Sequence, residues 1–343
     1  MRPTSKSLLT IALLATGCVA AAPGEGGSNG KPVDDNDPSG ELIQLSSNYK
    51  LSSTFQIGAS LPGPFGDALR EITAATDEGD DPAKWMLQKI IDNMSSGTLR
   101  STLNTFAGFA AGYLNDRLTS FAPNFVPAMK DVGARLNAAM QQLGTVSELK
   151  ISKNGTQLSA VHTVVGVRFG AIDTAPAFLF ASNGMSNIAV DKINIDIDRA
   201  GPVSIAEHKV PLTMGKVAVI ALNQVVIPSI DPNARNLGEL FTRLVNCDQV
   251  GSYLATAVGF GTASVYAAAC RGGLTFGANS IVAKLEAQNG VAFEFTLKGK
   301  GFAEDGDSDN VAEAISGGTW SGAISSGGTP ANLVNAKFEA EQQ

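Results

Sequence analysis

The chain is poor in the residues that most often carry chemistry. Two histidines and three cysteines occur among 343 residues. His162 and His208 each fall in a strand-like stretch with no cysteine or second histidine at metal-ligand spacing, so we interpret them as ordinary strand-face side chains. The sequence also lacks a phosphate-binding loop and a His-Glu-x-x-His pair. We therefore assign no catalytic residue from the sequence.

Charge is also scarce, and it is mostly of one sign. Charged residues make up 17% of the chain, and 25 basic residues stand against 32 acidic ones. No basic patch is present to displace the counterions of a nucleic acid, so we expect no nucleic-acid partner. Hydrophobic residues reach 44%, which is enough for one large domain or two modest domains with real cores.

Long hydrophobic runs are missing as well. The apolar run Leu8–Leu14 is far shorter than the ~20 residues that a membrane-spanning helix needs. Gln249–Cys270 carries no charge, but glycine, serine, threonine and alanine fill most of it, so its summed transfer energy is small. Ser101–Leu114 is also uncharged and is too short to span a membrane. We interpret both uncharged stretches as buried helices.

The first residues have the composition of an export signal. Residues 1–7 contain two basic side chains and no acid, and the short apolar run and the small residues 15–17 follow them. Leu13-Leu-Ala-Thr-Gly-Cys18 resembles the lipobox of bacterial lipoprotein precursors. In that family the cysteine sulfur receives a diacylglyceryl group and cleavage falls just before the cysteine. The resemblance implies that residues 1–17 are a signal peptide and that Cys18 is lipidated.

The next segment fits a lipid-anchored protein. Residues 18–40 are rich in Gly, Pro and Asp and cannot bury a core, so we expect a flexible tether that ends at a globular domain of residues 41–343. The lipid anchor predicts a membrane as partner, and Val19 after the cysteine favours the outer membrane. The alternative is ordinary secretion to the periplasm or medium, with cleavage after one of the alanines at 20–22.

The two remaining cysteines lie in a predicted helical hairpin. Asn236–Val258 has helical spacing, Gly259–Gly261 interrupts it, and Thr262–Cys270 resumes it. Cys247 and Cys270 lie ~18 and ~14 Å from the bend at ~1.5 Å per residue, so folding the helices back on each other brings the sulfurs alongside. We predict a Cys247–Cys270 disulfide, which an exported protein can form. The alternative is two buried free thiols.

The apolar pattern divides the domain into four stretches. Residues 64–143 and 234–271 have helical spacing, whereas residues 145–230 and 280–340 alternate like strands. This order predicts an α+β fold with an N-terminal helical segment packed on a mostly antiparallel sheet. The sheet can curl into a half-barrel or barrel, and the disulfide-linked helical hairpin is inserted between its strands.

Finer assignments follow from turn and spacing signals. Asn154-Gly155 predicts a hairpin between Val146–Lys153 and Thr156–Phe169. Helices are expected at Pro82–Met94, Thr98–Phe121 and Pro127–Leu143; strands are expected at Ile193–Asp198, Val203–Val210, Lys216–Ile227, Ser280–Ala287 and, after an Asn289-Gly290 turn, Val291–Lys298.

An acidic run is the best candidate for a binding site. Asp305, Asp307 and Asp309 alternate as the first ligands of a calcium loop do, and Glu313 stands at the ninth place. Asn310 occupies the sixth place, where such loops normally have glycine, and Ser316 the twelfth, where they have glutamate. The sequence thus offers a calcium site as the one candidate cofactor, with a solvated acidic loop as the alternative.

Three functions are compatible with these features. The first is a membrane-anchored envelope lipoprotein of non-catalytic role that holds a hydrophobic ligand between the helices and the curved sheet, where residues 98–121 and 250–270 line the cavity. The second is a structural or protein-interaction lipoprotein with no small ligand. The third is an enzyme without a recognisable motif.

Overall fold

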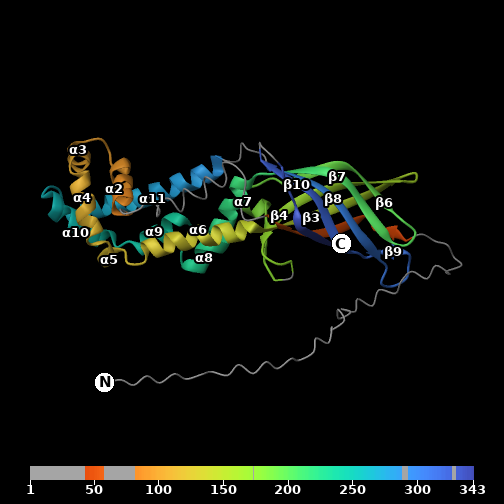
Figure 1. Ribbon diagram of the computed structural model, residues 1–343. Coiled ribbons are helices and arrows are strands. Elements are labelled where there is room, and N and C mark those ends of the chain that lie inside the picture. The colour runs from red at the N-terminus through yellow and green to blue at the C-terminus, as the bar shows by residue number, and fades with distance from the viewer. Residues whose placement is uncertain (1–42, 58–81, 173, 288–292, 327–329) are drawn as a thin grey trace, which may run out of the picture. The chain divides into compact units, whose positions relative to one another are not determined.

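The computed structural model describes residues 43–57, 82–172, 174–287, 293–326 and 330–343 (Figure 1). Helices and strands both contribute, which confirms the mixed α+β prediction. The strands form a barrel, and the helices occur in two blocks of sequence. That the helical segment packs on the sheet stays a prediction.

Eight antiparallel strands close into a barrel in the order β10-β12-β2-β3-β4-β6-β7-β8, and β8 returns to pair with β10. Each of the eight strands thus has a partner on both sides, which confirms the predicted barrel. The strands are β2 (Asn48–Gln56), β3 (Gln142–Asn154), β4 (Gln157–Phe169), β6 (Ile188–Ile197), β7 (Pro202–Leu212), β8 (Phe293–Glu304), β10 (Ala314–Ser326) and β12 (Val334–Gln342).

Four short strands lie beside the barrel. β5 (Ala177–Leu179) pairs with β4, and β11 (Ala331–Asn332) pairs with β10. β1 (Gln44–Leu45) pairs in parallel with β9 (Val311–Ala312) and forms a separate two-stranded sheet. The predicted hairpin is confirmed, because β3 and β4 pair through Asn154↔Gln157, with Gly155 in the left-handed conformation that the turn requires.

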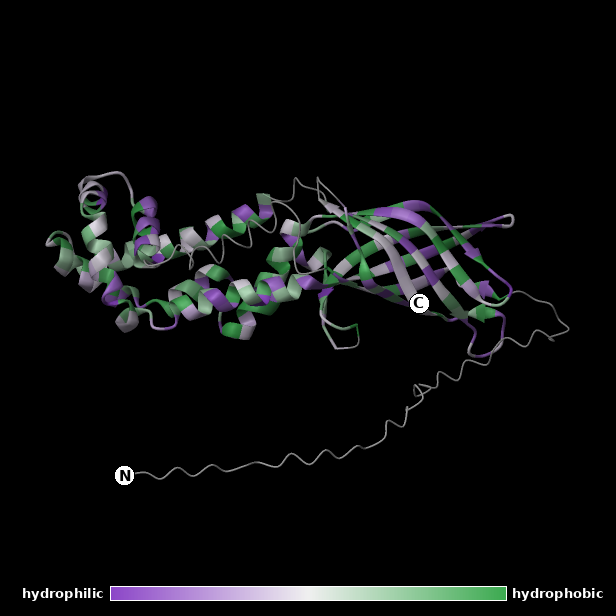
Figure 2. Ribbon diagram, in the orientation of Figure 1, coloured by the Kyte–Doolittle hydropathy of each residue, from purple (hydrophilic) through white to green (hydrophobic). Residues whose placement is uncertain are grey.

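Large side chains fill the barrel. Hydrophobic and hydrophilic residues alternate along its strands (Figure 2), as expected when one face is buried and the other is wet. Buried aromatic side chains point into the barrel from four strands: Tyr49, Phe55, Phe293, Phe295, Trp320 and Phe338. Gly299 makes room for the largest of them, since a Cβ there would lie 2.7 Å from the ring of Trp320.

The helices form two blocks, between β2 and β3 and between β7 and β8. The first holds α2 (Pro82–Asn93), α3 (Thr98–Thr105), α4 (Ala107–Asn115), α5 (Leu118–Phe121) and α6 (Phe125–Gln141). The second holds α7 (Met214–Ala221), a π-helical turn (Leu222–Val226), α8 (Ile227–Ile230), α9 (Leu237–Leu244), α10 (Cys247–Val258) and α11 (Ala263–Ala287). No helix among the described residues is long and apolar enough to cross a membrane.

Two predicted strands are wrong. Lys216–Ile227 belongs to α7, the π-helical turn and α8. Nearly every apolar side chain in it is buried, so its hydrophobic pattern does not distinguish a helix from a strand. Ser280–Ala287 is the end of α11, which continues through Gly272 and Gly273. Gly273 lets α11 lie against α2, since a Cβ there would be 2.6 Å from the Cα of Ile90. The helix predicted at Thr262–Cys270 is therefore 17 residues too short at its C-terminal end.

Other helix predictions hold in position and differ in their bounds. Thr98–Phe121 is broken into α3, α4 and α5, and Asn236–Val258 into α9 and α10. The second break occurs because Asn246 caps α10, its Oδ1 accepting a hydrogen bond from the Gln249 backbone N–H at 3.2 Å. Residues 1–42 and 58–81 and the expected Asn289-Gly290 turn lie outside the described residues.

Candidate functional sites

The acidic loop brings its four predicted ligands together. Carboxylate oxygens of Asp305, Asp307, Asp309 and Glu313 all lie within 4.8 Å of one another. The loop joins β8 to β9 and β10, so its two ends are held by the barrel. Burial, reinforced by the neighbouring carboxylates, raises the pKa of Asp307. Four clustered hard oxygens are the ligands that Ca²⁺ prefers, and the calcium site stays a prediction.

Backbone geometry explains how the loop turns so sharply. Ser308 and Asn310 both have φ of 66°, in the left-handed region that glycine normally fills. Asparagine tolerates this conformation, so Asn310 can take the place of the missing glycine. Asp305 fixes the turn, because its Oδ1 accepts a hydrogen bond from Ser308 N at 2.7 Å and its Oδ2 accepts one from Asn310 N at 2.9 Å.

The same loop holds the chain where it enters the barrel. The Gln44 backbone N–H donates to the Asn310 carbonyl at 2.8 Å, beside the β1–β9 pairing. The Tyr49 hydroxyl donates to the Ala312 carbonyl at 2.7 Å and accepts from Ser46 N at 2.9 Å. Burial raises the pKa of Tyr49 to about 12, so its proton stays on the hydroxyl. Residues 44–49 are thus tied to residues 310–312.

The two histidines of the chain meet inside the barrel. His162 on β4 and His208 on β7 place Nδ1 and Nε2, respectively, 2.9 Å apart. The ring of His162 stacks on Trp320 with an interplanar angle of 11°, and the Trp320 indole N–H donates to Ser53 Oγ at 3.0 Å. Both histidines are buried, so the prediction of ordinary strand-face residues is incomplete: they form a buried polar pair.

The hydrogen bonds fix the tautomers of this pair. The Ala206 carbonyl can only accept, so His208 Nδ1 donates to it at 2.9 Å and His208 Nε2 carries the lone pair. His162 Nδ1 must then donate to His208 Nε2, which leaves His162 Nε2 unprotonated and without a partner among the described residues. Burial, helped by neighbouring His208, lowers the pKa of His162 to about 3; burial also lowers the pKa of His208.

A groove in the barrel wall reaches one member of this pair, His208. β6 and β7 pair only over Ile195–Ile197 and Val203–Ile205, and beyond that point a groove of about 410 Å³ lies between them and reaches His208. Irregular pairing occurs next to each histidine, between Ala160 and His162 on β4 and between Ile205 and His208 on β7. The pairing of the wall is therefore irregular beside both histidines.

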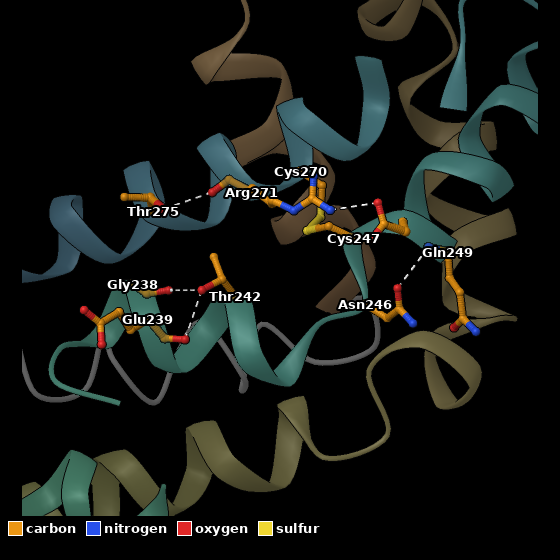
Figure 3. The surroundings of a disulfide bond; sticks show 10 residues. Gly238, Glu239, Thr242, Asn246, Cys247, Gln249, Cys270, Arg271 and Thr275 are labelled. Atoms are coloured by element: carbon orange, nitrogen blue, oxygen red, sulfur yellow. Dashed lines mark hydrogen bonds and ion pairs between the residues drawn. A yellow bond between two sulfur atoms is a disulfide. The ribbon is translucent and has the colours of Figure 1, made fainter. Parts of the chain in front are cut away.

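The predicted disulfide is present. Cys247 begins α10 and Cys270 lies on α11, and their Cα atoms are 5.6 Å apart (Figure 3). The helices can approach closely because Gly251 has no side chain. A Cβ at this position would lie 2.3 Å from the Ala263 carbonyl oxygen. Beside the bridge, Arg271 pairs with Asp248 at 2.7 Å.

The two uncharged stretches lie next to each other. Tyr113 on α4 and Tyr253 on α10 are in edge-to-face contact, with ring centroids 6.4 Å apart. At the far end of these helices, a Cβ at Gly261 would lie 3.2 Å from the Leu99 side chain of α3. We call residues 101–114 together with residues 249–265 the apolar end.

The apolar end exposes aromatic side chains. Phe106, Phe109 and Phe260 are 46%, 62% and 50% exposed, respectively, although all three lie in stretches predicted to be buried. Val265 is also exposed. The prediction of buried helices is therefore wrong for this part of the two stretches. Among the sites predicted from the sequence, only Cys18 falls outside the described residues.

Comparison with known proteins gives no relative. No protein-family model matches the chain, and no curated protein and no solved structure does so. The candidate sites must therefore be judged by their geometry alone.

Proposed function

We propose that this chain is a lipid-anchored, non-catalytic protein of the bacterial envelope that binds a hydrophobic ligand at its apolar end. The anchor is Cys18, supported by the lipobox resemblance of residues 13–18 and by the Gly/Pro/Asp-rich segment that follows. The binding role rests on one observation: two uncharged segments, far apart in sequence, meet and leave three phenylalanines exposed. Exposed apolar patches are typical of binding surfaces.

The packing of the barrel supports this location for the ligand. Buried aromatic side chains such as Phe295, Trp320 and Phe338 occupy its interior. The sequence predicted a ligand site between the helices and the sheet. We propose instead that the ligand binds at the surface made by α3, α4 and the α10–α11 turn.

Metabolic labelling tests the anchor. In a bacterial host fed an alkyne-tagged palmitate, the wild-type chain should carry the label and fractionate with the outer membrane. Cys18→Ser should carry no label. A wild-type protein that is exported, unlabelled and soluble would refute the anchor and establish ordinary secretion.

Dye binding tests the ligand site. The full chain carrying Cys18→Ser, titrated with an uncharged naphthylamine dye, should enhance the dye's fluorescence. Adding Phe106→Ser, Phe109→Ser and Phe260→Ser should abolish this enhancement. Phe302→Ser on the barrel is the matched control, since Phe302 is 56% exposed and lies outside the apolar end. No enhancement by the parent chain would favour the structural or protein-interaction role.

Calcium binding at the acidic loop is a second part of this proposal. A cation held by Asp305, Asp309 and their neighbours would relieve the repulsion among four converging carboxylates. Calorimetric titration should show Ca²⁺ binding that Asp305→Asn and Asp309→Asn abolish, whereas Asp196→Asn on the barrel surface should leave it unchanged. Equal heats from the wild type and the loop variants would show that the loop is only solvated.

A further inference from the structure

We infer that the ligand of the apolar end is the surface of a phospholipid bilayer, into which the α3–α4 and α10–α11 turns insert. This inference rests on the proposed function and names its partner. Three observations carry it: the absence of charge over two converging segments, the exposure of their phenylalanines, and a rim of tyrosine and arginine beside them.

The distribution of charge favours lipid over a protein partner. No Asp, Glu, Lys or Arg occurs in residues 101–114 or 249–265, although 17% of the whole chain is charged. Protein interfaces carry a polar, charged rim, whereas a charged group in the hydrocarbon core costs ~2.5–3.5 kcal/mol. The seven residues Gly259–Val265, at the α10–α11 turn, are uncharged, and all but Ala263 are exposed.

The rim has the chemistry of a membrane interface. Tyr113 and Tyr253 lie side by side, and the Arg117 guanidinium lies 5.7 Å from the centroid of each ring. Tyrosine and arginine are the side chains that place an apolar body toward lipid and a polar group at the headgroups. Phe109 precedes Tyr113 by four residues, or ~6 Å along α4. With Tyr113 at the headgroups and α4 pointing into the bilayer, that offset places Phe109 at the ~5–10 Å depth typical of interfacial helices.

The mode of contact is shallow insertion. α4 has nine residues and α10 has twelve, or ~14 and ~18 Å at ~1.5 Å per residue, which is less than the ~30 Å hydrocarbon core, so the α3–α4 and α10–α11 turns enter one leaflet. The hydropathy colouring shows α4 as mostly pale to green, in contrast to the purple residues on the barrel surface (Figure 2). Because the inserted surface is uncharged, binding should depend little on salt.

Vesicle flotation tests the inference. The full chain carrying Cys18→Ser should float with zwitterionic phosphatidylcholine vesicles at both low and high salt. Phe106→Ser, Phe109→Ser and Phe260→Ser combined should lower the partition coefficient at least ~30-fold, at roughly three- to tenfold for each half-exposed ring. Phe302→Ser should leave it unchanged.

A second variant tests the inference even if the triple phenylalanine variant does not fold. Phe260→Trp should show a blue-shifted emission on addition of the same vesicles, and the unmodified chain should show little change. Dye binding at the apolar end without flotation would overturn the bilayer inference and leave the proposed function standing. Self-association that depends on the three phenylalanines, without flotation, would identify a second copy of the chain as the partner instead.

Discussion

The buried histidine pair predicts that acid destabilises the barrel. Burial lowers the folded-state pKa of His162 to about 3, below its ordinary value of 6.5. The folded state therefore binds fewer protons than the unfolded state between pH 6.5 and about 3. The stability that neutral, buried His162 contributes is fully present above pH 6.5, and it is lost as the pH falls from 6.5 toward about 3. Protonation of His208 at Nε2 would also replace the N–H···N bond from His162 Nδ1 by two facing donors.

The size of this effect follows from the shift. Each pH unit inside the window costs ~1.4 kcal/mol for His162, so the free energy of unfolding at pH 5 should be ~2 kcal/mol lower than at pH 7. His208 adds to the loss in the same direction. Carboxyl groups with ordinary pKa values are mainly ionised between pH 7 and 5, so the histidines dominate the change in this interval.

Urea unfolding followed by the fluorescence of Trp320, in a Trp85→Phe background, measures the loss. The double variant His162→Leu/His208→Leu should remove most of the difference between pH 5 and 7. Proton NMR gives a check that needs no variant, because the chain contains only two histidines. A His162 ring that titrates near pH 6.5 in the folded protein would refute the reasoning.

Three variants test the packing. Replacing Cys247 and Cys270 by alanine opens a loop with a sequence separation of 23 and should lower the free energy of unfolding by ~3 kcal/mol in urea titrations. Gly299→Ala should cost ~1–3 kcal/mol, because the new methyl group would lie 2.7 Å from the Trp320 ring; an unchanged thermal midpoint would contradict this packing. Gly108→Ala, in α4 with nothing within 4 Å of the new Cβ, should instead raise the thermal midpoint.

Local signals in the sequence predicted the features that depend on nearby residues. The hairpin at residues 154–155 and the disulfide both follow from short-range geometry, and both are confirmed. Features that depend on tertiary packing, such as the length of α11, were not predicted. Gly272 and Gly273 normally weaken a helix, yet α11 continues through them because α2 packs against their bare backbone.

The candidate sites show the same difference between features set by nearby residues and features set by tertiary packing. The acidic ligands lie within nine residues, so their spacing was sufficient to indicate the cluster. His162 and His208 are 46 residues apart on strands separated by β6. Only the strand order and the inward direction of both side chains bring them together. The exposed phenylalanines were missed because uncharged stretches are typical of buried helices, and nothing in their spacing marks an outer face.

The parallel pairing of β1 with β9 has a mechanical consequence. A pull on the chain before Gln44 first loads this short pairing and the Tyr49 hydroxyl bond to Ala312. The next element in line is β2, which pairs with β3 and β12 on its two sides. Ladder bonds run perpendicular to the strands, so a pull along β2 shears many of them at once instead of peeling them one by one. A pull applied before Gln44 thus meets the short β1–β9 pairing first and the two long ladders of β2 second.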